Sequence, residues 1–174
     1  MPSPENELGC CIERELVGGA QPVIDALRAA GLSVATAESC TGGLIAAILS
    51  HAQNASECLH GGFVVYTKAN KAKVLGVDRD LLETQGAVNV EVARQMAQGA
   101  LERSPASVAV SVTGVLGPDA DEDGNPAGLV CFAVCREGAT TVVSRREFSQ
   151  MQPDGVRRAA VLHALELLYG SCYT

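Results

Sequence analysis

The segment TAESCTGG, residues 36–43, places three side chains that can act as nucleophiles, Ser39, Cys40 and Thr41, directly before two glycines. The residues before the segment are typical of a strand and those after it of a helix, so the three side chains lie at a helix N-terminus. Free backbone N–H groups and the positive end of the helix dipole can hold an anion or a developing oxyanion there. Helix capping by Ser39 or Thr41 is the simpler alternative. The two glycines favour a ligand site, because glycine costs helix stability but allows a ligand to approach the backbone.

A lysine that can serve as a base follows in the segment GGFVVYTKANKAK. Tyr66 ends a predicted strand, and Lys71 lies five residues later in a short predicted helix. A serine needs a base before it attacks, and burial can lower the pKa of a lysine from about 10.4 towards about 7. A solvated helix lysine and a tyrosine at the edge of the core are the alternatives for these two positions. No Ser–His–acid triad is indicated, because the histidines lie in or near predicted helices without a matching acid: His51, His60 and His163.

A second polar loop, VTGVLGPDADEDGNPAG, follows another predicted strand. Its first part, Thr113-Gly114-x-x-Gly117-Pro118, can wrap a phosphate with backbone N–H groups, although the lysine and hydroxyl residue of a Walker loop do not follow. Arg157, in the first turns of the last predicted helix, can clamp a phosphate if it faces these loops, and is otherwise an ordinary surface arginine.

The second part of this loop is similar to the opening of a calcium-binding loop, with Asp119, Asp121, Asp123 and Gly124. The twelfth position of such a loop must supply a bidentate glutamate, but it is Val130 here, and the flanking segments are predicted strands, not helices. We therefore expect a solvated acidic turn and no metal site.

Composition and charge exclude several classes of protein. The 174 residues carry a net charge of −7 and only 3% aromatic residues, whereas a nucleic-acid binder needs a basic face and, for single strands, aromatic platforms. No signal peptide and no apolar run of about 18 residues is visible. Seven cysteines without C-x-x-C spacing indicate free thiols in a reducing cytoplasm and no zinc site. We expect a cytoplasmic protein with no nucleic-acid partner, no membrane association, no metal and no cofactor.

The order of predicted elements indicates a single α/β domain. Residues 1–9 are expected to be flexible and 10–174 to form the domain, which opens with a helix over about 8–30 that has a break at Gly18-Gly19 or Pro22. Strands predicted at 32–37, 61–67, 107–114, 128–136 and 140–148 alternate with helices predicted at 42–50, 68–76, 78–86, 89–104 and 153–170. The last two strands form a hairpin. This pattern predicts a three-layer α/β/α sandwich around a mixed sheet, in which ligands bind beyond the carboxyl ends of the strands.

Six segments together resemble the CinA C-terminal domain family, in the family's order and over about Gly31–Leu168. They are TAESCTGG, GFVVYTKANKAKVLGV, LLETQGAVNVEVARQMAQGAL, TGVLGP, PAGLVCFAV and VRRAAVLHALELL. Members of this family act as nicotinamide-nucleotide amidases. The resemblance therefore implies a small-molecule nucleotide substrate, nicotinamide mononucleotide, whose carboxamide is hydrolysed to give nicotinate mononucleotide and ammonia without a metal or cofactor.

The resemblance also implies roles for individual residues. Ser39 corresponds to the family's proposed nucleophile, and Lys71 and Tyr66 to the lysine and tyrosine that serve it, with the tyrosine passing a proton to the departing ammonia. The backbone N–H groups of Cys40 and Thr41 are expected to bind the oxyanion. The other substrate-binding residues that we expect are Thr36, Glu38, Gly42, Gly43, Thr113, Gly114, Gly117, Pro118 and Arg157, of which the last five hold ribose and phosphate.

Three positions bear on substrate affinity. Glu38 is expected to be the counter-charge of the cationic pyridinium. The loop GVLGPDADEDG departs from the family pattern, which usually has GIAGP followed by glycines, so that an acidic insert stands close to the expected phosphate. Asn89 stands where family members often carry serine.

Two other functions stay open. The same loops can belong to a non-catalytic nucleotide-binding module in which Lys71 contacts a phosphate, or to a protein associated with competence or DNA damage, which the acidic charge disfavours. Burial separates the first alternative from an amidase, since a catalytic Lys71 must be desolvated within hydrogen-bond reach of Ser39 or Tyr66.

An alanine-rich helix with exposed apolar surface favours a homodimer.

Overall fold

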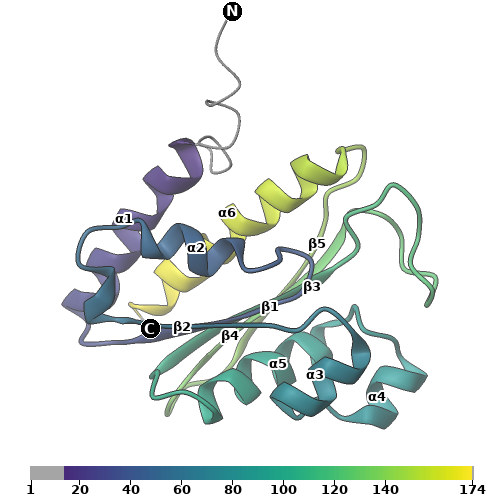
Figure 1. Cartoon of the computed structure of the whole chain (residues 1–174), viewed down its shortest axis with the longest axis horizontal. Coiled ribbons are helices and arrows are strands. Elements are labelled where there is room, and N and C mark those ends of the chain that lie inside the picture. Colours follow the sequence, from purple (N-terminus) through teal and green to yellow (C-terminus); the bar gives the residue numbers. More distant parts are fainter. Residues whose placement is uncertain (1–13, 174) are drawn as a thin grey trace, which may run out of the picture.

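The chain folds around a five-stranded mixed sheet with strand order β2-β1-β3-β4-β5 (Figure 1). The structure, a computed structural model, describes residues 14–173. The strands are β1 (Val34–Glu38), β2 (Leu59–Val64), β3 (Val108–Gly114), β4 (Leu129–Arg136) and β5 (Val142–Glu147). β1 runs parallel to β2 and to β3, whereas β4 and β5 form the predicted antiparallel hairpin.

Helices cover both faces of this sheet, as Figure 1 shows. One layer contains α1 (Arg14–Ala29), α2 (Leu44–Ser50) and α6 (Pro153–Ser171), and the other contains α3 (Lys68–Leu75), α4 (Arg79–Thr84) and α5 (Val90–Glu102). A 3-10 turn at Ala55–Glu57 connects α2 to β2. The predicted three-layer α/β/α sandwich is therefore confirmed. None of the described helices is long and apolar enough to cross a membrane.

The helix boundaries follow the expected capping signals. Asn89 accepts a hydrogen bond from the backbone of Val92 at the start of α5, and Gly76 ends α3 in the left-handed conformation that glycine favours. The close packing of the aromatic-poor core needs a missing side chain at Gly99 of α5, where a Cβ atom would collide with the backbone carbonyl of Leu75 in α3.

Most predicted boundaries lie within two residues of the observed ones, but the course of the first helix and the end of β2 differ from the sequence prediction. The expected break in α1 is absent, because the helix continues through Pro22; the carbonyl of Gly18, which loses its helical partner to the proline ring, lies at an exposed position open to water. β2 ends at Val64, three residues before the predicted end, because the carbonyls of the next two residues turn towards a lysine of α3. The expected flexible segment 1–9 and the start of the first helix near residue 8 lie outside the described residues.

The two polar loops singled out in the sequence lie at one edge of the sheet. Because β1 and β3 are adjacent and parallel, their carboxyl ends point the same way, and the loops at 39–43 and 115–128 follow them directly. The segment at 65–67 leaves the parallel neighbour β2 at this edge as well. The edge is therefore the place where side chains from three distant segments can converge.

Candidate active site

Ser39 and Lys71 form a buried pair at the carboxyl edge of the sheet. Ser39 follows β1 directly, and its backbone N–H donates to the carbonyl of Val112 in β3 at 3.0 Å, which fixes the start of the loop. Lys71 lies in α3 with only 1% of its surface exposed. Its Nζ lies 2.8 Å from Ser39 Oγ, 3.0 Å from the carbonyl oxygen of Val65 and 3.2 Å from that of Tyr66.

This geometry suits a lysine that acts as a base. Burial lowers the pKa of Lys71 from 10.5 to about 8, while the nearby Cys40 acts in the opposite direction. A neutral amine has two N–H groups and one lone pair. When the N–H groups donate to the carbonyls of Val65 and Tyr66, the lone pair points to Ser39, whose hydroxyl proton it can accept. The alternative of a solvated helix lysine is therefore wrong.

The side chains of the two other candidate nucleophiles in the loop make no hydrogen bond to Lys71 within the described residues. Burial raises the pKa of the Cys40 thiol to about 12, so the thiol stays protonated near neutral pH. The hydroxyl of Thr41 donates to Glu38 Oε2 at 2.7 Å and is held away from Lys71. Among Ser39, Cys40 and Thr41, the serine is the side chain that the structure pairs with a base.

Glu38 does not contact the cavity that opens above Ser39, and its expected role as counter-charge of the substrate is wrong. The side chain has no exposed surface. Its two oxygens accept five hydrogen bonds, from the hydroxyls of Thr36 and Thr41 and from the backbone N–H groups of Gly43, Ile45 and Ala46, at 2.7–3.1 Å. Thr36 is also fully buried, so its expected contact with substrate is wrong for the same reason.

Glu38 also changes what the start of α2 can bind. Its carboxylate occupies three of the N–H groups at this helix end, which corrects the expectation that they are free for a substrate anion. The backbone N–H groups of Cys40 and Thr41 make no hydrogen bond to another residue within the described chain. Cys40 follows Ser39 directly and Thr41 is the next residue along, so these two N–H groups stay candidates for binding an oxyanion.

A cavity of about 530 Å³ opens above the Ser39–Lys71 pair. Thr113 lines it, although its hydroxyl donates to the carbonyl of Ala87 at 2.8 Å. Tyr66 also lines the cavity with 72% of its surface exposed, which overturns the alternative of a tyrosine at the edge of the core.

Two further cavities adjoin the first around Cys40 and Tyr66. One, of about 360 Å³, is lined by Gly114, Gly117 and Arg157, and the other, of about 460 Å³, by Thr41, Gly42, Gly43 and again Arg157. Arg157 of α6 therefore faces the glycine-rich loops, and its NH1 lies 3.1 Å from Asp154 Oδ1. Pro118 is an expected binding residue that lines none of the three cavities.

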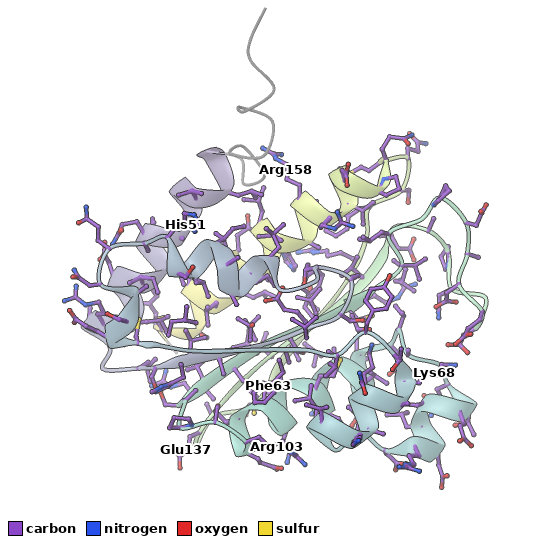
Figure 2. The ribbon with its side chains drawn as sticks, viewed as in Figure 1. His51, Phe63, Lys68, Arg103, Glu137 and Arg158 are labelled. Carbon is purple, nitrogen blue, oxygen red and sulfur yellow. The ribbon has the colours of Figure 1, made fainter. Side chains whose placement is uncertain are left out.

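The acidic loop forms one wall of the first cavity and is not simply a solvated turn. Asp123 lies 2.5 Å from Lys68 Nζ and accepts a hydrogen bond from the backbone of Ala87, and the ammonium of Lys68 lowers the pKa of Asp123. Glu122 lies 3.4 Å from the same lysine. Figure 2 shows Lys68 at the end of the molecule where this loop lies. Sequence reasoning missed the role of Lys68. The available signal was that the segment containing Lys68 and the acidic loop both follow strands at the same edge of the sheet.

The expectation that no histidine has a matching serine and acid is wrong for His163. His163 Nε2 lies 2.9 Å from Ser144 Oγ, and Nδ1 lies 3.2 Å from Glu166 Oε2. Arg146 Nε also donates to Nε2 at 3.4 Å, and Phe132 packs edge-on against the imidazole ring. Ser144 and Arg146 of β5 thus bond to His163 of α6, and because these residues line none of the three cavities described above, their role is to hold the edge strand to its covering helix.

An α/β/α sandwich with a buried serine–lysine pair at the carboxyl edge of its sheet defines a structural class, and comparison with known proteins identifies the family. The sequence profile of the CinA C-terminal domain matches residues 18–172. The chain belongs to the CinA C-terminal domain family.

The relatives that match the chain include one of about its own length and others that are much longer. The chain is 39% identical to the nicotinamide-nucleotide amidohydrolase PncC of Escherichia coli K12 over 160 residues, covering 90% of the chain and 94% of that protein. It is 52% identical over 110 residues to a CinA-like protein of Chlorobium phaeobacteroides, covering 62% of the chain and 26% of that protein. The chain spans 26–34% of the length of this and two other long relatives.

Solved structures have the same fold. A competence/damage-inducible protein from Agrobacterium tumefaciens superposes with a TM-score of 0.85 at 39% identity, covering 90% of the chain and 94% of that protein. A CinA superfamily protein from Escherichia coli gives a TM-score of 0.84 at 35% identity, covering 97% and 98%.

Proposed function

We propose that this chain hydrolyses the carboxamide of nicotinamide mononucleotide to nicotinate mononucleotide and ammonia, in the salvage of pyridine nucleotides. The observation that carries the proposal is the 2.8 Å contact between Ser39 Oγ and the buried Lys71 Nζ beneath an open cavity. The Escherichia coli relative that spans nearly the whole chain supports the substrate. A non-catalytic binding module has no use for a desolvated lysine aimed at a serine, so the burial of Lys71 favours an enzyme.

In the first half of the reaction, neutral Lys71 takes the hydroxyl proton of Ser39 while Ser39 Oγ bonds to the carboxamide carbon. The N–H groups of Cys40 and Thr41 receive the negative charge that develops on the carbonyl oxygen. The tetrahedral intermediate then releases ammonia, which must gain a proton to leave, and Tyr66 passes that proton from Lys71. The product of this half is an ester between nicotinate mononucleotide and Ser39.

In the second half, water attacks the ester carbon and gives a proton to Lys71. The bond between this carbon and Ser39 Oγ then breaks, Ser39 Oγ takes the proton back from Lys71, and the carboxylate is freed. Arg157 and the glycines of the two smaller cavities lie where they can hold the phosphate while the ring stays at Ser39. Every proton transfer in this scheme uses residues of the chain.

The proposal is tested by ammonia release from nicotinamide mononucleotide in the presence of a chelator. We expect release by the wild type and a loss of at least about a thousandfold in Ser39→Ala, because the attacking atom is gone. Ser50→Ala is the matched control, since it removes an exposed serine of α2 that bonds only to its own helix. If the nucleotide binds but neither the wild type nor Ser50→Ala releases ammonia, the chain is a binding module and the proposal is wrong.

We further propose that the chain is a cytoplasmic homodimer. The described cysteines are all free thiols, which a reducing compartment preserves. Tyr169 of α6 lines an apolar groove of about 400 Å³ between α1 and α6. It is exposed and packs edge-on against Tyr173, which is also exposed and follows the helix. Light scattering of the purified protein tests the dimer, and Tyr169→Ser is expected to weaken it if this face is the interface.

A further inference from the structure

The cavity above Ser39 and the cavity beside Arg157 share a boundary. Four residues line both of them: Cys40, Tyr66, Gly114 and Asp121. Asp121 is the charged residue among the four. Ser39 and Lys71 line only the first cavity, and Arg157 lines only the second and third. A ligand that reaches from Ser39 to Arg157 passes this boundary.

The charges of the proposed substrate match the charged residues along these cavities, and this inference rests on the proposed function. Its carboxamide must lie at Ser39, and its phosphate is attracted to Arg157. The positive charge of the pyridinium is on the ring nitrogen, which carries the bond to the ribose and therefore joins the two halves of the molecule. With the halves in the two cavities, the ring nitrogen lies at the boundary, beside the carboxylate of Asp121 and the exposed ring of Tyr66.

Asp121 is held in place at the boundary without a cationic partner. Its Oδ1 accepts hydrogen bonds from the backbone N–H groups of Asp123 and Asn125, and its Oδ2 accepts one from Asn125 Nδ2. None of these partners, within the described residues, carries a positive charge. Its neighbours in the loop differ, because Glu122 and Asp123 both lie close to the ammonium of Lys68.

We propose that Asp121 is the specificity-determining residue that selects a cationic pyridinium ring over an uncharged ring. A fixed carboxylate beside the ring nitrogen favours the charged ring, and the exposed aromatic face of Tyr66 favours a cation as well. The acidic loop therefore serves the ring end of the substrate, because Asp121 lies at the boundary, and Glu122 and Asp123 line the first cavity and not the cavity beside Arg157. Glu38, which the sequence indicated for this role, is enclosed by hydrogen bonds and cannot perform it.

The test compares two ligands in the Ser39→Ala protein, which cannot turn over. Calorimetry measures the Kd of nicotinamide mononucleotide and of its 1,4-dihydro form, which has the same ribosyl phosphate but an uncharged ring. We expect Asp121→Asn to weaken binding of the cationic nucleotide about fivefold, typical of a partly exposed charge pair, and to leave the dihydro form unchanged. Asp121→Glu, which keeps the charge, should preserve most of the preference.

Asp119→Asn is the matched control, because Asp119 is an exposed acid of the same loop that lines none of the three cavities. The inference is overturned if Asp121→Asn weakens both ligands equally, or if Asp119→Asn lowers the preference as much. A Ser39→Ala protein that binds neither nucleotide, with a wild type that releases no ammonia, refutes the proposed function itself and this inference with it.

Discussion

Replacement of Lys71 by methionine tests whether the pKa of this lysine is lowered in the folded protein. Methionine has a similar unbranched side chain but takes no proton. In the wild type, the pKa is about 8 in the folded chain and about 10.5, the ordinary value, in the unfolded chain. At pH 7 both states hold the proton, so the folded protein bears the whole cost of burying the charge. Between pH 8 and pH 10.5 only the unfolded chain holds it, and the cost disappears as the pH rises.

The size of the effect follows from these two values. Each unit of pKa difference corresponds to about 1.4 kcal/mol, so the cost of the buried charge at pH 7 is about 3 kcal/mol. Most of it is gone at pH 10. The free energy of unfolding of the wild type, relative to Lys71→Met, should therefore rise by about 2 to 3 kcal/mol between pH 7 and pH 10. Methionine cannot replace the hydrogen bonds of Lys71, but their loss changes the difference in the free energy of unfolding by the same amount at both pH values. The rise between the two pH values is therefore unchanged.

Urea unfolding at the two pH values measures the rise. The control is Lys73→Met, which removes an exposed lysine from the same helix. The reasoning is refuted if the difference between wild type and Lys71→Met stays constant between pH 7 and pH 10, or if Lys73→Met shows the same change.

Two further predictions concern the same loop and lysine. We expect kcat/KM for nicotinamide mononucleotide to rise with pH through an apparent pKa of about 8, since Lys71 must lose its proton before it can accept that of Ser39; a profile that is flat from pH 6 to pH 9 contradicts a lysine base. We expect Glu38→Gln to lower the free energy of unfolding by about 2 to 4 kcal/mol, measured in urea, because an amide nitrogen in place of one oxygen faces donors that then lack an acceptor. Glu57→Gln, which changes an exposed acid, should cost less than about 1 kcal/mol, and an equal loss in both variants contradicts the anchoring role of Glu38.

Much of the architecture can be predicted from the sequence, because strand and helix patterns depend on residues close together in the chain. Asn89 and Gly76 mark helix ends through bonds and backbone angles that are local. The predicted course of α1 and the predicted end of β2 were wrong, because the surroundings of these segments in the folded chain decided both. A break at Gly18-Gly19 or Pro22 was expected in α1, but the helix continues because the carbonyl that loses its partner to Pro22 is exposed to water. β2 ends early because the carbonyls that follow it turn to Lys71.

The sequence by itself also determined which residues were candidates for chemistry, since only a few side chains can attack a carboxamide or hold a phosphate. Their roles were decided by the tertiary structure. Ser39 and Lys71 are 32 positions apart, and the low pKa of the lysine exists only because the fold buries both groups together. Glu38 and Asp121 are both acids in polar loops, yet one is enclosed by five donors and the other lies at a cavity boundary. Burial and electric field depend on which distant segments meet, and local sequence does not specify that.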